Sequence, residues 1–478
     1  MLRKLPGSET VGLVSTTPET AVVFAPTVVR TPAVVTLLIL GWRLVVGVVH
    51  LVVRHPVACS LVGLASGMVY ALGWRLALIV VGSIVCAVST WAGLWPALGM
   101  RVLGWPLVAW WRWVWVYRRR WRSVLAVSGL SRSITGRTWT PGLLRVRCSS
   151  WADAVTVRML AGQSDEDWAD RAANLAHGFG STWCRVSSPR PGWVTLTFPR
   201  RDPLAEPLQA RPIPRRPVVG SVEIGACEDG TPYRLKVHGT HVLIAGATGA
   251  GKGSWLWGTV RGLLPALDVG LAQVWGLDPK RMELSFGKAL LNEYAATPEE
   301  CAELLERAVE VMQERADRYA GVQRSHLPTL DDPFILVLVD EVAFLTAYQP
   351  DRGLKARIMA ALATLTTQGR AVGIGVMAAL QDPRKEVMNI RNLFPDKIAL
   401  RLDEAEQVDM VLGDGARERG ALADQIARDP ADPSVGAGTA FVRLETSPEP
   451  LRVRAAYVSD DDIKQMIMRY SDVREAWL

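Results

Sequence analysis

A run of small residues that ends in a lysine, residues 244–254, has the composition of a loop that binds nucleotide phosphates. Gly246, Gly251 and Lys252 fit the pattern G-x-x-x-x-G-K-[ST], in which backbone N–H groups and the lysine meet the phosphates. The pattern breaks at Gly253, which stands where a hydroxyl side chain would bind Mg²⁺, and Ser254 follows one position late. These residues alone leave three interpretations open: a working nucleotide site, a damaged one, or a chance run of small residues.

A second candidate group of catalytic residues ends an apolar run at residues 334–341. Six consecutive apolar residues are typical of a strand that is buried on both faces. At its carboxyl end Asp340 could hold Mg²⁺, and Glu341 could polarise the water that attacks a phosphate. The alternative is a core strand that happens to end in two acids, and the P-loop earlier in the chain favours the catalytic interpretation.

Two further apolar runs end in polar residues. Residues 272–280 end in Asp278, Pro279 and Lys280, and residues 373–381 end in Gln381. Ligands of open α/β sheets bind at the carboxyl ends of the strands, so Gln381 is a candidate sensor of the γ-phosphate. A structural turn residue is the alternative role for Gln381.

The elements needed to position these residues can be predicted from residue 218 onward, where apolar runs alternate with amphipathic segments. This alternation predicts a doubly wound, mostly parallel sheet. Residues 241–247 form a predicted strand that runs into the glycine-rich loop, and residues 254–264 form a predicted helix after it. Strand, loop and helix in this order are the context that a P-loop requires, and they favour a nucleotide site.

The first third of the chain has a different composition. Residues 57–74 and 76–100 are uncharged and each is long enough to cross a bilayer, which predicts a helical hairpin turning near Arg75. Residues 33–53 contain Arg43 and predict a third span or an interfacial helix. Buried helices of a soluble protein are the alternative. Seven tryptophans between residues 91 and 115 resemble an interfacial belt, and the basic cluster at 118–122 predicts that the remainder of the chain is cytoplasmic.

Charge and cysteine content add little to this picture. Residues 1–150 contain 16 basic and 2 acidic residues, whereas the remainder contains 38 and 45, so the basic pI does not by itself indicate nucleic-acid binding. The six cysteines form no C-x-x-C pair and are expected to be reduced structural thiols. The predicted organisation is a tail at 1–32, a membrane region at 33–122, a small α/β domain at 123–204, a proline-rich linker at 205–217 and the P-loop domain at 218–478.

The P-loop region resembles the motor domain of the FtsK/SpoIIIE family of DNA-translocating ATPases over roughly residues 220–470. The segments that carry the resemblance are "HVLIAGATGAGKGS", "LDPKRMEL", "FILVLVDEVAFL", "QGRAVGIGVMAALQDP" and "IRNLFPDKIALRLD". The loop with its extra glycine looks like that of actinobacterial members linked to conjugative and integrative elements. The resemblance implies a RecA-like fold, ATP and Mg²⁺ as cofactors, and a homohexameric ring that threads double-stranded DNA.

The resemblance also implies roles for particular residues. Lys252, Glu341 and Gln381 would be catalytic, and Asp340 would bind Mg²⁺ together with water or a displaced Ser254. An arginine of one subunit would complete the neighbour's site, with Arg370 the first candidate and Arg401 the second, and either could instead be an ordinary surface arginine. The expected nucleotide-binding residues are Gly246, Ala247, Thr248, Gly249, Ala250, Gly251, Lys252, Gly253 and Ser254.

The leading functional hypothesis is therefore a multi-pass membrane protein with a cytoplasmic ATPase that pumps double-stranded DNA. Conjugative transfer and chromosome segregation are both open as its biological process. An ATPase for protein export is a second hypothesis, because related motor domains occur in such machines. A membrane scaffold that binds nucleotide or DNA without hydrolysis is a third, which Gly253 keeps open.

Overall fold

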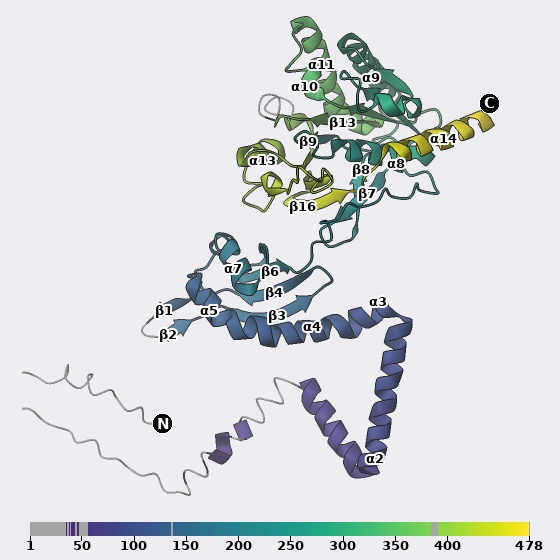
Figure 1. Ribbon diagram of the computed structural model, residues 1–478. Coiled ribbons are helices and arrows are strands. Elements are labelled where there is room, and N and C mark those ends of the chain that lie inside the picture. The colour runs from purple at the N-terminus through teal and green to yellow at the C-terminus, as the bar shows by residue number, and fades with distance from the viewer. Residues whose placement is uncertain are drawn as a thin grey trace, which may run out of the picture. The chain divides into compact units, whose positions relative to one another are not determined.

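The computed structural model describes residues 56–134, 137–383 and 391–477, together with 35, 38, 40–43, 45 and 46. The chain forms two compact units, Met1–Met100 and Arg101–Leu478. The second unit contains a small domain built on a four-stranded sheet and a larger domain built on a ten-stranded sheet (Figure 1).

Among the described residues of the first unit, most belong to the apolar helix α2, Pro56–Leu94. Gly73 interrupts it with φ 76° and ψ 155°, a backbone conformation that glycine adopts without a steric penalty. The two arms on either side of this kink form a V in Figure 1, and the short helix α3, Pro96–Gly99, follows the second arm. The kink lies two residues before Arg75, where the sequence predicts a turn.

Of the described residues, one helix, Gly73–Leu94, is long and apolar enough to cross a membrane. It has 22 residues, and nearly all of them are exposed. It overlaps the predicted span at 76–100. The predicted span at 57–74 falls in the first arm of α2, which is helical, and a second membrane span there stays a prediction. Most of the candidate at 33–53 lies outside the described residues.

The small domain is an antiparallel sheet covered by helices on one face. The sheet has four strands, and Ser164 caps one of the helices, with its hydroxyl accepting from the N–H of Asp167. The strands, in spatial order, are β3 (Gly142–Cys148), β4 (Ala152–Arg158), β6 (Trp193–Pro199) and β5 (Arg185–Arg190). The helical segments are α4 (Trp105–Arg112), η3 (Trp113–Arg118), α5 (Arg119–Val127), α6 (Asp165–Ala169) and α7 (Ala172–Phe179), and a hairpin of β1 (Arg132–Ile134) and β2 (Arg137–Trp139) lies apart from the main sheet.

The helical segment 105–127 belongs to the core of this domain. Tyr117, Trp121 and Leu125 recur every four residues and are buried against the inner face of the sheet, beside Val155 and Leu196. The sequence places residues up to 122 in the membrane region, so the packing boundary lies earlier than predicted. Aromatic residues on one helix face serve equally well as a membrane belt or as a core face, and sequence spacing does not separate the two.

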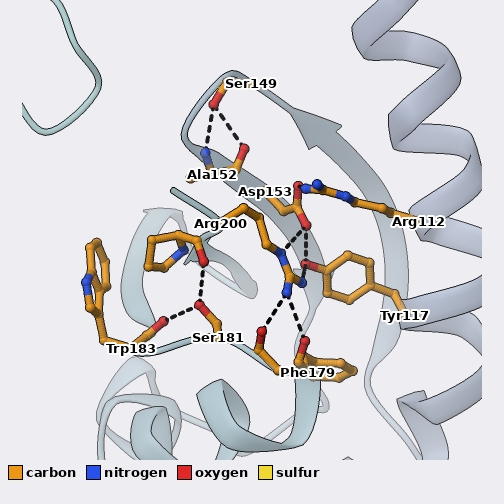
Figure 2. Close-up of polar contacts among 11 residues, drawn as sticks. Arg112, Tyr117, Ser149, Ala152, Asp153, Phe179, Ser181, Trp183 and Arg200 are labelled. Carbon is orange, nitrogen blue, oxygen red and sulfur yellow. Dashed lines mark hydrogen bonds and ion pairs between the residues drawn. The ribbon is translucent and has the colours of Figure 1, made fainter. Parts of the chain in front are cut away.

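A buried charge network ties this helical segment to the sheet (Figure 2). Asp153 on β4 is fully buried, and its carboxylate accepts from Tyr117 Oη at 2.8 Å and Arg200 Nε at 2.8 Å and pairs with Arg112. Arg200 also donates to the carbonyl oxygens of Phe179 and Gly180. The buried carboxylate is therefore paired on both oxygens, as a stable buried charge must be.

The larger domain is a mixed sheet of ten strands. Six neighbouring strands, from β11 to β14 in spatial order, are parallel as predicted, and the other four join antiparallel, so the sheet is less uniform than expected. The spatial order is β11 (Glu293–Ala295), β10 (Ala272–Leu277), β12 (Phe334–Val339), β13 (Ile374–Leu380), β9 (Val242–Ala245), β14 (Asp396–Ala399), β15 (Thr439–Leu444), β16 (Ser447–Ala455), β7 (Ser221–Cys227) and β8 (Pro232–Lys236).

Helices cover both faces of this sheet, so that side chains pointing to opposite faces of a strand join two separate hydrophobic cores. In β9, Leu243 and Ala245 join one core and Val242 and Ile244 join the other. The first core includes α9 (Pro298–Tyr319), α11 (Arg352–Gln368) and α13 (Ala405–Leu412), and the second includes α8 (Lys252–Asp268) and α14 (Asp460–Trp477).

The order of the parallel strands brings the predicted catalytic residues to one edge. Strand β13 pairs with β9 on one side and with β12 on the other, and β10 follows β12. Parallel strands end at the same edge, so the loops that carry Gly246, Gln381, Glu341 and Asp278 emerge side by side.

Candidate nucleotide-binding site

The glycines of the loop between β9 and α8 are required by its path. Gly249 and Gly251 have φ values of 70° and 92°, which side chains other than glycine rarely adopt. A Cβ on Gly251 would overlap the backbone of Gly438, whose N–H donates to the Ala250 carbonyl at 2.8 Å. This geometry argues against a chance run of small residues.

Lys252 begins α8 and folds back over the loop. Its Nζ donates to the carbonyl oxygens of Gly246 at 2.7 Å and Ala247 at 3.3 Å. Burial lowers the pKa of Lys252 to about 8, although the nearby carboxylates of Glu341 and Asp340 act in the opposite direction. The ammonium group is therefore held at the loop, close to two acids.

The acid at the end of β12 joins three strand ends into one hydrogen-bonded group. Glu341 is buried, and its Oε2 lies 3.0 Å from Lys280 Nζ in the loop after β10. Its Oε1 accepts from the backbone N–H of Gln381 at 3.3 Å, at the end of β13. The structure thus brings together Glu341 and Gln381, two of the residues for which the sequence predicts catalytic roles.

Two side chains contact Thr248 at the tip of the loop. The Thr248 hydroxyl donates to Gln381 Oε1 at 3.3 Å, so Gln381 reaches the loop with its side chain. Arg401 donates from Nη2 to the Thr248 carbonyl at 2.7 Å and is largely buried. Arg401 therefore supports the loop of its own chain, and a contact with a neighbouring subunit stays a prediction.

The loop after β10 is held by the fully buried Asp278. The Asp278 carboxylate accepts from the N–H groups of Met282 at 3.2 Å, Leu284 at 3.0 Å and Ser285 at 2.9 Å. Arg281, with φ 56°, is the one residue other than glycine with positive φ among those that the structure describes. Such backbone strain persists only where the surrounding contacts fix the conformation, and here the contacts of Asp278 fix the loop that carries Lys280 and Glu283.

Glu283 is the residue of this site that the sequence pattern did not predict. Its carboxylate lies against Gly253, where an added Cβ would overlap Oε1 and would come within 2.8 Å of Cδ. The signal in the sequence was its place in "LDPKRMEL", directly after a strand that pairs with the acid-bearing strand. Ser254, the predicted substitute ligand, is buried on α8, and its role stays a prediction.

The acids at this edge repel one another. Burial first, and then the neighbouring carboxylates of Asp278, Glu283 and Glu341, raise the pKa of Asp340 to about 7 against the opposing effect of Lys280. Carboxylate oxygens suit Mg²⁺, which proteins bind through one or two carboxylates together with nucleotide phosphates. Among the described residues, no group of three or more acidic, histidine or cysteine side chains could hold a metal ion.

Arg370 does not join this group within its own chain. It lies in η5, Gly369–Val372, which precedes β13 and so lies at the amino ends of the parallel strands. Its Nη1 is 2.8 Å from Glu445 Oε2, and both side chains are exposed. A contact of Arg370 with a neighbouring subunit stays a prediction.

Comparison with known proteins adds family information to this geometry. Residues 90–199 match the family "Actinomycete conjugal transfer protein N-terminal domain", a range that runs from the last turns of α2 to the end of β6. The helical segment 105–127 and the sheet therefore share one family domain as well as one core.

Curated relatives of the chain include DNA translocases. DNA translocase FtsK of Oceanobacillus iheyensis is 25% identical over 248 residues, which cover 48% of this chain and 29% of FtsK. FtsK of Staphylococcus aureus strain Mu50 is 24% identical over 309 residues, which cover 59% of this chain and 37% of FtsK. The chain thus spans about a third of the length of these relatives.

A solved structure of the pCW3 conjugation coupling protein TcpA with ATPγS aligns with a TM-score of 0.48 and 18% identity, covering 73% of this chain and 98% of TcpA. The sequence matches and the P-loop site together identify the chain as similar to FtsK/SpoIIIE-type translocases, with an actinomycete conjugal transfer domain at residues 90–199.

Proposed function

We propose that this chain is an ATP-driven translocase that moves double-stranded DNA during conjugal transfer. The observation that carries the proposal is the group formed by Lys280, Glu341 and Gln381 beside the P-loop lysine, Lys252. The similarity to FtsK supports DNA as the cargo, and the conjugal transfer domain supports conjugation over chromosome segregation.

In this proposal each residue of the site has a chemical task. The N–H groups of the P-loop and the Lys252 ammonium bind the nucleotide phosphates. Glu341 orients a water molecule and accepts its proton as that water attacks the γ-phosphate, while Lys280 holds the carboxylate in position. Gln381 lies next to Thr248 and can contact the γ-phosphate from the neighbouring strand. Mg²⁺, held by Asp340, would neutralise charge on the phosphate oxygens.

The protein works at the membrane as a homohexamer in this proposal. The exposed apolar helix Gly73–Leu94 supports an anchor, and the arginines at 118–120 and 122 support a cytoplasmic P-loop domain by the positive-inside rule. A second span in the other arm of α2 would make the anchor multi-pass. Arg370, exposed at the opposite edge of the sheet, is the candidate that would reach a neighbouring subunit's nucleotide.

The test is the rate of ATP hydrolysis by the full chain in detergent, with and without linear duplex DNA. Stimulation by DNA that Lys252→Ala abolishes supports the proposal. Hydrolysis that DNA leaves unchanged contradicts it and favours a protein-export ATPase. If the wild-type chain hydrolyses ATP no faster than the Lys252→Ala variant, the proposal is wrong and the hypothesis of a non-hydrolysing scaffold remains.

A further inference from the structure

The P-loop of this chain has a carboxylate where other P-loops have a hydroxyl. The residue after the P-loop lysine is ordinarily Ser or Thr, and its hydroxyl binds Mg²⁺. Here that residue is Gly253, and the Glu283 carboxylate fills the space into which a side chain at 253 would project. A residue with a Cβ fits at 253 only if the Glu283 side chain moves, so the glycine leaves room for the carboxylate.

The loop that carries Glu283 is built to hold it there. Two of the three N–H groups that Asp278 accepts belong to Met282 and Leu284, the direct neighbours of Glu283. Arg281 takes up the strained turn, and Lys280 anchors the start of the loop on Glu341. The backbone on both sides of Glu283 is thus fixed, and it carries the Glu283 side chain beside the P-loop.

The charges around Glu283 also favour a cation. Asp278 and Asp340 both interact with it electrostatically, and Lys252 is the nearby positive group. Three acids in a partly buried space repel one another, and a divalent cation beside them would relieve that repulsion. The phosphates of a nucleotide on the P-loop would reach the same place at the start of α8.

We propose that Glu283 supplies the oxygen ligand toward nucleotide-bound Mg²⁺ that the missing hydroxyl supplies elsewhere, directly or through a water molecule. The inference rests on the proposed nucleotide-binding function and assigns a residue within that site. Glu283 and Asp340 together provide the one or two carboxylates with which proteins bind Mg²⁺ beside phosphates.

The test compares ATPγS binding by the full chain in Mg²⁺ and in EDTA, by titration calorimetry, and measures bound Mn²⁺ by electron paramagnetic resonance. Glu283→Gln keeps the shape and removes the charge. We expect it to lower metal affinity about ten- to a hundredfold, as loss of a metal-site partner does, while the affinity in EDTA is unchanged. Glu310→Gln, an exposed acid on α9, is the control and should change neither.

Measuring ATPγS affinity both in Mg²⁺ and in EDTA separates a failure of the proposed role of Glu283 from a failure of the proposed function. An equal loss of affinity in Mg²⁺ and EDTA, or no loss in either, overturns the role of Glu283 and leaves the proposed function intact. A wild-type chain that binds no ATPγS in either condition overturns both. If Ser254→Ala lowers Mn²⁺ affinity and Glu283→Gln does not, Ser254 is the ligand and the inference is wrong.

A reciprocal substitution provides a second, independent test. Gly253→Ser alone should weaken Mn²⁺ binding, because its side chain collides with Glu283. Glu283→Ala removes both the proposed metal ligand and the side chain that blocks a serine at 253. The double variant Gly253→Ser/Glu283→Ala should therefore recover much of the Mn²⁺ affinity that Glu283→Ala loses, because the serine hydroxyl can then bind the metal. A double variant that binds Mn²⁺ no better than Glu283→Ala contradicts the exchange of one oxygen ligand for the other.

Discussion

Lys280 Nζ and Glu341 Oε2 lie 3.0 Å apart and join the loop after β10 to the acidic end of β12. The Glu341 side chain is 3% exposed, whereas 31% of the Lys280 side chain is exposed. Because water reaches the Lys280 ammonium but hardly reaches the Glu341 carboxylate, loss of the ion pair would destabilise the charge on Glu341 more than the charge on Lys280. The ion pair with Lys280 therefore holds the Glu341 carboxylate in place.

Replacing Lys280 should lower both the stability of the larger domain and the rate of ATP hydrolysis. Lys280→Met leaves the Glu341 carboxylate without its charged partner and should destabilise the larger domain by about 2 kcal/mol, the cost of an unmet hydrogen bond to a charged group. ATP hydrolysis should fall further than nucleotide affinity, because the acid is misplaced while the P-loop is intact. Thermal melts and nucleotide titrations check this. Lys288→Met, in the same region but outside the site, is the control.

Asp153 should be essential to the small domain. Asp153→Ala leaves the guanidinium groups of Arg112 and Arg200 without their shared carboxylate and should cost about 3–5 kcal/mol, the usual cost of breaking a buried pair from one side. Limited proteolysis of the full chain should then cut within residues 105–199 at a lower temperature. Asp165→Ala, in an exposed first turn, should leave the cleavage pattern unchanged, and equal resistance of both variants would contradict the role of the network.

Arg454 connects the linker to the segment that packs on the P-loop. Its buried guanidinium donates to the Leu204 and Ala205 carbonyls, each at 2.9 Å, and to those of Ser434 and Ala437. Arg454→Lys keeps the charge but lacks the planar fork needed for four carbonyls, so it should lower both thermal stability and ATPγS affinity. Arg428→Lys, an exposed arginine of the same region, should lower neither.

Acid should destabilise the P-loop strand through His241. Burial first, and the positive charge of Arg370 second, lower the pKa of this fully buried histidine to about 4, and its Nδ1 accepts from the Val376 N–H at 3.0 Å. The folded state keeps it neutral while the unfolded chain takes up a proton below pH 6.5. This contribution to stability is therefore present above pH 6.5 and is lost as the pH falls, by about 2 kcal/mol at pH 5.

His241→Asn tests this pH dependence, because the Asn Oδ1 can accept the same hydrogen bond without titrating. The variant should lose less thermal stability than the wild type between pH 7 and pH 5. Parallel losses in both proteins would show that His241 does not account for the acid sensitivity.

The sequence predicted those parts of the molecule that depend on local pattern. The P-loop and the acid pair Asp340–Glu341 follow from short-range rules of spacing, and the structure places the first between β9 and α8 and the second directly after β12. The convergence of Glu341 and Gln381 also followed, because the carboxyl ends of parallel strands share one edge.

The features that the sequence did not predict depend on contacts between distant segments. Glu283 and Gly253 are thirty positions apart, and only the folded loop after β10 shows that one fills the space left by the other. Arg401 appeared as a candidate for a neighbouring site because an arginine near a strand end suits that role, yet it supports Thr248 in its own chain. The helix at 105–127 was ambiguous for a different reason, since an aromatic face suits both a bilayer interface and a protein core.

The central claim, ATP-driven movement along double-stranded DNA, is tested most directly by displacement of a third strand from a duplex. The full chain and ATP should release a labelled triplex-forming strand placed far from the loading end, and Glu341→Gln, which keeps the P-loop but lacks the catalytic carboxylate, should not. Release by the wild type but not by the variant is the predicted result. Hydrolysis of ATP by the wild type with the third strand left in place would contradict the account.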